Sequence, residues 1–110
     1  INEGDTLSAF VKVATTKDLS PGEMLFVEFD GQAVLLVNVD GTFYAVSEEC
    51  THSSCPLSDG ILQGKVVECK CHGATFDVST GNVLTPPADE PLTTYPVKID
   101  GEDILISSPT

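Results

Sequence analysis

Short apolar runs separated by turn residues set the pattern of this chain. Six runs of four to seven residues are rich in β-branched and aromatic side chains, which favour strands. These runs are residues 8–14, 24–29, 33–39, 43–46, 95–99 and 103–107. Asp-Gly dipeptides at 30–31, 40–41 and 100–101 lie between neighbouring runs and predict tight hairpins. Only residues 18–22 are compatible with a short helical turn. We therefore expect an all-β fold, an antiparallel β-sandwich or small barrel.

The segment from about residue 47 to 87 differs from the rest of the chain. It has fewer apolar runs and many turn residues. We expect it to be a smaller subdomain inserted into the basal β-sheet domain, because functional loops are commonly raised on a rigid scaffold. The length of 110 residues and the 41% of apolar residues indicate one globular domain, residues 1–110, and not a disordered chain.

The net charge and the hydropathy of the chain limit the kinds of partner that it can bind. Acidic residues outnumber basic residues by 17 to 5, which argues against nucleic acid and anionic membranes. The acidic surface either keeps the protein soluble or attracts a redox partner protein with a basic docking face. No run approaches the roughly 18–20 apolar residues of a membrane span, and no signal-peptide pattern is visible. The chain starts at Ile1 and not at methionine, which is compatible with a removed leader or anchor. We expect the protein to be a monomer.

All four cysteines and both histidines lie in two short boxes. The first box runs from Cys50 through His52 to Cys55, and the second holds Cys69, Cys71 and His72. Sixteen residues separate His52 from Cys69. Thiolates and imidazoles from two facing loops can bind one metal ion or two. A single tetrahedral zinc ion is one alternative, although the short C-x-H spacing is unlike that of common zinc fingers.

The boxes resemble the Rieske iron–sulfur family, whose pattern is C-x-H, a gap of about sixteen or seventeen residues, and C-x-x-H. The similarity continues in Pro56-Leu57, Asp59-Gly60, Phe76-Asp77 and the proline-rich stretch Thr85-Pro86-Pro87-Ala88. It spans roughly residues 43–106. The resemblance therefore implies the Rieske fold and a 2Fe–2S cofactor.

In that family one iron is bound by two cysteines and the other by two histidines. The resemblance assigns these roles to Cys50 and Cys69, and to His52 and His72. Neutral imidazoles remove negative charge from the site, which raises the reduction potential to about −150 to +300 mV, against about −400 mV for an all-cysteine plant-type cluster. If the second ring nitrogens of the histidines face solvent, as in the family, the potential should fall at alkaline pH.

The resemblance also implies a disulfide between Cys55 and Cys71, which some Rieske proteins have at these positions. The alternative is two reduced, buried thiols. A disulfide would indicate an extracytoplasmic location, or a cytoplasmic one in a thermophile. Rieske proteins of bc complexes carry hydroxyl donors to the cluster where this chain has Ala74 and Phe76. We therefore expect a lower potential than in bc complexes.

We expect a one-electron carrier, a soluble Rieske-type ferredoxin that has no catalytic residues of its own. The alternatives are a soluble fragment of a bc-complex Rieske subunit, or the small subunit of an oxygenase, arsenite oxidase or nitrite reductase.

The remaining aromatic and acidic side chains are expected to have structural or surface roles. Aromatic residues expected in strands or in the core are Phe10, Phe26, Phe29, Phe43, Tyr44 and Tyr95. The acidic pairs Glu48-Glu49 and Asp89-Glu90 are expected to be solvated or to form a docking rim.

Overall fold

The computed structural model describes residues 10–50, 55–71, 73–86 and 90–109. Within these ranges the chain forms antiparallel strands and two short 3-10 helices, which confirms the expected all-β antiparallel fold. The elements are β1 (Val11–Thr15), η1 (Thr16–Asp18), β2 (Met24–Phe29), β3 (Gln32–Val39), β4 (Thr42–Ser47), η2 (Leu57–Asp59), β5 (Ile61–Gln63), β6 (Val66–Glu68), β7 (Thr75–Asp77), β8 (Val83–Thr85), β9 (Thr94–Tyr95), β10 (Val97–Asp100) and β11 (Asp103–Ile106). In the described part of the chain, no helix has the length and apolar character that a membrane crossing needs.

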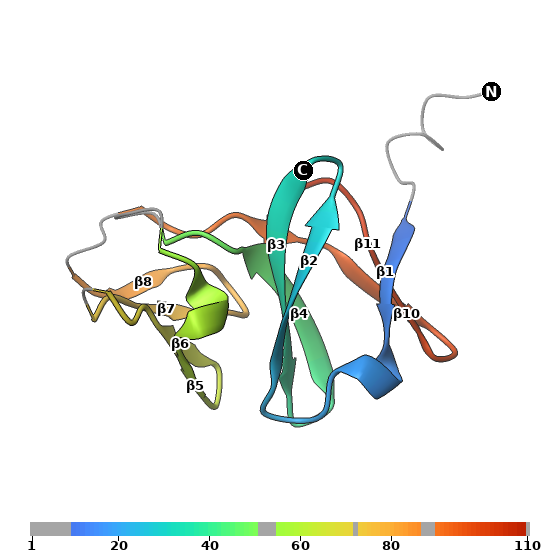
Figure 1. Ribbon diagram of the computed structural model, residues 1–110, viewed down its shortest axis with the longest axis horizontal. Helices are drawn as coiled ribbons and strands as arrows, with labels where there is room; N and C mark the ends of the chain where they lie inside the picture. The colour runs from blue at the N-terminus through green and yellow to red at the C-terminus, as the bar shows by residue number, and fades with distance from the viewer. Residues whose placement is uncertain (1–9, 51–54, 72, 87–89, 110) are drawn as a thin grey trace.

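The strands form three sheets, which Figure 1 shows from end to end of the molecule. One end holds the sheet β1-β11-β10, and the other end holds the sheet β5-β6-β7-β8. Between them lies the sheet β2-β3-β4-β9. Each sheet pairs its neighbouring strands in antiparallel register. The middle sheet therefore has another sheet on each side.

Strand β3 shows how the middle sheet joins the other two. Leu35 and Val37 pack into one apolar core with residues of the sheet β5-β6-β7-β8. Val34 and Leu36 pack into a second core with residues of β1 and β11. All four side chains are fully buried. A strand covered on both faces has an unbroken apolar run, because neither face meets water.

Two of the three expected hairpin turns follow directly from their dipeptides. Asp30 and Gly31, and likewise Asp40 and Gly41, all have positive φ, as a type I′ turn requires. Phe29 then faces Gln32 across the first turn. The third Asp-Gly site also lies in a tight connection, since Asp100 pairs with Asp103. These local turns fix the register of β2, β3, β4, β10 and β11.

Two aromatic residues differ in what surrounds them. Tyr95 in β9 is buried and packs edge-on against Phe29, with ring centroids 6.0 Å apart. Phe26 lies in a strand as expected, but its side chain is 48% exposed and contributes little to either core. Strands β5 to β8 were not anticipated individually, because runs of three residues are too short to show a period.

Candidate metal centre

The described ends of the first box, Cys50 and Cys55, lie shortly after the end of β4. The amide of Cys50 donates to the carbonyl of Cys55 at 3.0 Å, which closes the loop. Below it, Glu49 and Pro56 form an antiparallel bridge, and the Leu57 amide donates to the Glu48 carbonyl at 2.7 Å. The two chain ends of this loop are therefore held together by a short ladder.

The second box forms the connection from β6 to β7. The amide of Cys69 donates to the carbonyl of Ala74 at 2.7 Å, and the Gly73 amide donates back to Cys69 at 2.9 Å. Gly73 has φ +79°, a conformation that other residues adopt at a cost. Both loops thus begin with a cysteine and are closed by backbone hydrogen bonds at their base.

Those two cysteines lie in the apolar core that Leu35 shares with the sheet β5-β6-β7-β8. The exposed fraction is 4% for Cys50 and zero for Cys69. Burial of this kind keeps water away from any metal–sulfur bond formed there. The two histidines of the boxes, His52 and His72, lie outside the described residues.

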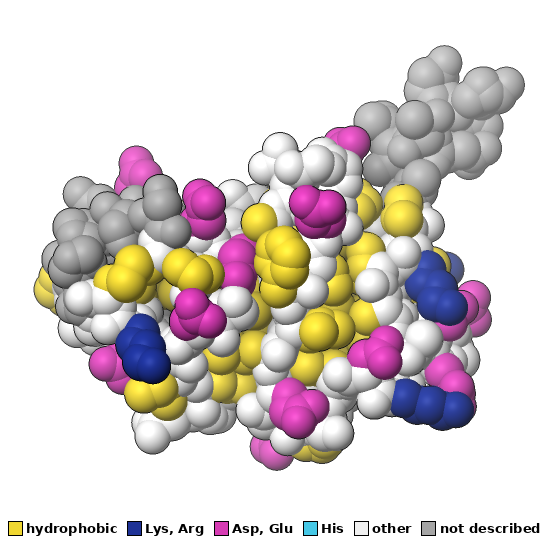
Figure 2. Space-filling view, viewed as in Figure 1, with side chains coloured by type: hydrophobic (Ala, Val, Ile, Leu, Met, Phe, Trp, Pro, Cys, Tyr) yellow, Lys and Arg dark blue, Asp and Glu magenta, His cyan; other side chains and the backbone are white. Residues whose placement is uncertain are grey.

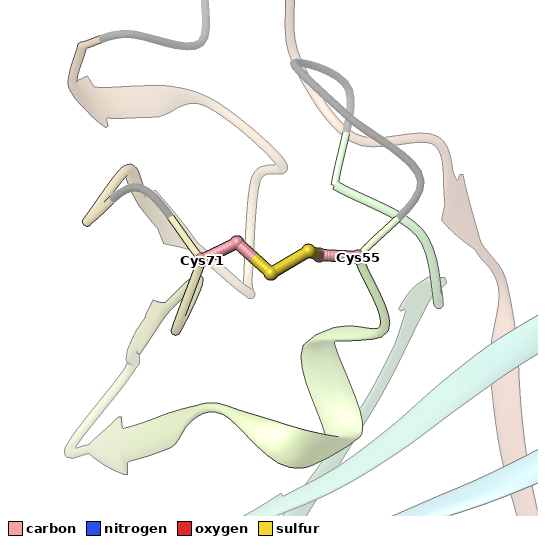
Figure 3. The surroundings of a disulfide bond; sticks show 2 residues. All are labelled: Cys55 and Cys71. Carbon is pink, nitrogen blue, oxygen red and sulfur yellow. A yellow bond between two sulfur atoms is a disulfide. The ribbon is translucent and has the colours of Figure 1, made fainter.

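A disulfide joins the two loops, as the family resemblance implied (Figure 3). Cys55 comes from the segment before η2, and Cys71 from the segment after β6. Their Cα atoms are 6.4 Å apart, and 16 positions separate them in the sequence. The bond holds the two loops side by side, which brings the buried cysteines at their starts into one region.

Glu48 was expected to be solvated or part of a docking rim, but its carboxyl group is buried and accepts hydrogen bonds. Glu48 is only 5% exposed. The Ser58 amide donates to one carboxyl oxygen at 3.1 Å, and the Ser58 hydroxyl donates to the other. Burial raises the pKa of this carboxyl above its usual range, while the Ser58 hydrogen bonds oppose that rise and the nearby Asp59 and Glu49 add to it. Glu49 is exposed, as expected.

Replacing Glu48 by alanine is expected to lower the free energy of unfolding by about 1–3 kcal/mol, because both Ser58 donors lose their acceptor in a largely buried site. Glu48→Gln should lose much less, since an amide oxygen still accepts from the Ser58 amide and no charge is buried. Urea unfolding at neutral pH measures both values. Equal losses in the two variants would contradict this role for the hydrogen bonds.

Two residues near the second box stand where Rieske proteins of bc complexes have hydroxyl groups. Ala74 and Phe76 are fully buried beside the second loop and have no hydroxyl group. Thr75 lies between them, and its hydroxyl is hydrogen-bonded to that of Thr85 on β8 at 2.7 Å. The Thr75 hydroxyl therefore forms a hydrogen bond between strands β7 and β8.

The described lysines are distributed unevenly. Lys12 and Lys17 form exposed salt bridges with Asp103 and Glu102, at 3.2 and 3.3 Å. The Lys98 amine lies 5.9 Å from the centre of the Phe10 ring. Figure 2 shows basic side chains mainly at the end that carries β1, β10 and β11, with acidic side chains spread over the same face. The other two lysines, Lys65 and Lys70, lie in the part of the chain that carries β5 to β8, so both ends of the molecule carry some positive charge.

The comparisons with known proteins agree with this geometry. A family model described as the Rieske 2Fe–2S domain matches residues 9–96. The biphenyl dioxygenase ferredoxin subunit of Pseudomonas sp. (strain KKS102) is 46% identical over 98 residues, covering 88% of this chain and 90% of that protein. The biphenyl 2,3-dioxygenase ferredoxin component of Rhodococcus jostii (strain RHA1) is 43% identical over 98 residues, covering 89% and 92%.

Solved structures are similar as well. The ferredoxin of carbazole 1,9a-dioxygenase from Nocardioides aromaticivorans IC177 superposes with a TM-score of 0.87 at 34% identity, covering 94% of this chain and all of that one. A chain in the complex of reduced oxygenase and oxidized ferredoxin in carbazole 1,9a-dioxygenase gives 0.85 at 32% identity, with 89% and 92% covered.

Proposed function

Because this chain belongs to the Rieske 2Fe–2S family, we propose that Cys50 and Cys69 bind one iron of the cluster and that His52 and His72 bind the other. The donor chemistry supports the assignment, since two thiolates and two imidazoles are the Rieske ligand set. So does the burial of Cys50 and Cys69 in one apolar core at the starts of two disulfide-linked loops.

The proposed cluster-binding part comprises about residues 47–87, inserted in a single domain. Two observations support this division. The sheet β5-β6-β7-β8 is built entirely from residues within that segment. The strands that flank the segment, β4 and β9, pair with each other in the middle sheet, where Ala45 faces Tyr95.

The chain is a Rieske-type ferredoxin, an electron carrier and not itself a catalyst. The cluster, when held by the chain, would supply one-electron redox chemistry. The protein supplies the conditions for that exchange. Cys50 and Cys69 sit in a core that excludes water, the disulfide holds the two ligand loops together, and the Glu48–Ser58 contact fixes the base of the first loop.

The proposed electron acceptor is the terminal oxygenase of an aromatic-ring dioxygenase system. The observation that carries this proposal is the 46% identity, over nearly the whole chain, to a ferredoxin subunit of biphenyl dioxygenase. A related solved structure is a complex between an oxygenase and a ferredoxin. The net charge of −12 further supports a basic docking face on the partner.

Rapid mixing of the reduced chain with an oxidised terminal oxygenase tests this function. Electron transfer should be fast at low ionic strength and slow as salt is added, because complementary charges steer the encounter. Glu49→Lys, next to the first ligand loop, should slow association. Asp100→Lys, in the β10–β11 hairpin at the other end of the molecule, is the matched control. Transfer that is insensitive to salt and to both variants would contradict the basic docking face, and no transfer at all would contradict the proposed acceptor.

Adding a hydroxyl at Ala74 or Phe76 is expected to raise the reduction potential. A donor to cluster sulfur stabilises the more negative, reduced state by about 1–1.4 kcal/mol, which is about 40–60 mV for a one-electron couple. Voltammetry of Ala74→Ser and Phe76→Tyr measures the rise. Thr75→Val is the control, because it removes a hydroxyl that is already bound to Thr85. If neither added hydroxyl raises the potential, the absent donors do not explain a low value.

A further inference from the structure

Three sulfur atoms converge next to the proposed cluster site. The sulfur atoms of Cys55, Cys69 and Cys71 all lie within 4.8 Å of one another, and Cys50 is not part of this group. Two of the three form the disulfide, and the third belongs to a buried cysteine that we assign to the cluster. Among the described residues, this group therefore shares Cys69 with the proposed cluster ligands and does not include Cys50.

The oxidation state of the disulfide determines what the group can bind. Metal ions bind thiolates, and the two sulfurs of a disulfide carry no thiolate charge. With the disulfide intact, Cys69 is the only thiol in the group. After reduction the group offers three thiols, a set that zinc and other thiophilic ions bind well. Three sulfurs around one tetrahedral zinc ion stand about 3.8 Å apart, given Zn–S bonds of about 2.3 Å.

The placement of the three cysteines supports the same conclusion. Cys69 and Cys71 are separated by one residue in the second loop, and Cys55 ends the first loop. The loops are held at their bases by backbone hydrogen bonds that do not depend on the disulfide. Once the sulfur–sulfur bond opens, the three side chains need only small rotations to surround one ion.

We propose that the reduced, cluster-free chain binds one thiophilic divalent cation through Cys55, Cys69 and Cys71. A dithiol reductant gives two electrons and two protons to the disulfide and is itself oxidised to a disulfide. The cation then replaces the three thiol protons. Because this site uses Cys69, it competes with cluster insertion, and the intact disulfide removes two of its three ligands. The site rests on the positions of the three sulfur atoms and requires neither a bound cluster nor a redox partner.

Cadmium titration of the full chain, prepared without iron, tests the proposal. Sulfur-to-cadmium charge transfer absorbs in the near ultraviolet, so thiolate ligation is read directly. After treatment with a dithiol, the wild-type chain should gain this absorbance and saturate at one Cd²⁺ per chain. The untreated chain, in which Cys55 and Cys71 stay joined and only Cys50 and Cys69 are thiols, should give a clearly weaker band, because this absorbance rises with the number of thiolates bound. Cadmium added to a zinc-loaded chain should displace the zinc, because the softer ion binds thiolates more tightly. Circular dichroism before each titration confirms that the β-fold is retained.

Serine variants identify the ligands. In the dithiol-treated chain, Cys55→Ser, Cys69→Ser and Cys71→Ser should each lose the saturable band, whereas Cys50→Ser should keep it. The proposal is overturned if the treated wild type binds no cadmium, if the untreated chain binds it equally, or if Cys50→Ser abolishes the band while Cys55→Ser does not. The last result places the ion on the cluster ligands. Iron binding by the untreated chain tests the cluster assignment separately.

Discussion

Serine in place of Cys69 is expected to abolish binding of the 2Fe–2S cluster, while serine in place of Cys71 should leave most of it. The two positions are only two residues apart in the same loop, but their environments differ. Cys69 is fully buried in the core between the sheets, and Cys71 is exposed and joined to Cys55. A thiolate ligand cannot be replaced by a neutral hydroxyl, since iron–sulfur clusters are held by deprotonated sulfur.

Iron and sulfide content of the purified variants, with the visible absorbance of the cluster, measures this difference. Both substitutions are close to isosteric, so Cys71→Ser controls for any general disturbance of the loop. Equal cluster content in Cys69→Ser and the wild type would remove Cys69 from the ligand set. Equal loss in both variants would indicate that loop integrity, and not the identity of the ligand, decides whether the cluster is retained.

Removing the disulfide is expected to lower the free energy of unfolding of the cluster-free chain by about 3 kcal/mol. The Cys55–Cys71 bond closes a loop of 16 positions, and the chain-entropy model gives about this value for such a loop. That is a large fraction of the stability of a small domain. The loss should appear as a lower urea midpoint in the double variant Cys55→Ser/Cys71→Ser.

Reduced wild-type chain provides the matched control for that double variant. It has the same open loop with both native side chains, so its midpoint should agree with that of the variant. If the oxidised and reduced chains unfold at the same urea concentration, the bond does not constrain the unfolded chain. A shift in the double variant alone would instead be assigned to the serine side chains.

The turns and the metal-binding boxes were predictable because they depend on neighbouring residues. Asp30-Gly31 and Asp40-Gly41 predicted their hairpins because few other residue pairs tolerate two successive positive φ values. The clustering of cysteine and histidine in two boxes is likewise visible in the sequence. The disulfide pairing came from the family resemblance, which distinguished Cys55 and Cys71 from the ligands.

Features that depend on distant contacts were not predictable in the same way. The apolar run of β3 indicates a strand buried on both faces, but not which sheets cover them. The carboxyl group of Glu48 is hydrogen-bonded by Ser58, which lies ten positions later in the chain, beyond the first box. In the sequence, Glu48 is half of an acidic pair whose other member, Glu49, is exposed. Phe26 shows the reverse, an aromatic strand residue left at the surface.

The central claim, a one-electron carrier whose cluster has cysteine and histidine ligands, is tested most directly by voltammetry of the purified chain from neutral to strongly alkaline pH. We predict a reversible one-electron wave between about −150 and +300 mV that shifts to lower potential at alkaline pH, because histidine ligands lose protons more readily when the iron is oxidised. A wave near about −400 mV that does not change with pH would indicate an all-cysteine cluster and contradict the account. So would a chain that carries zinc, without iron, and gives no wave.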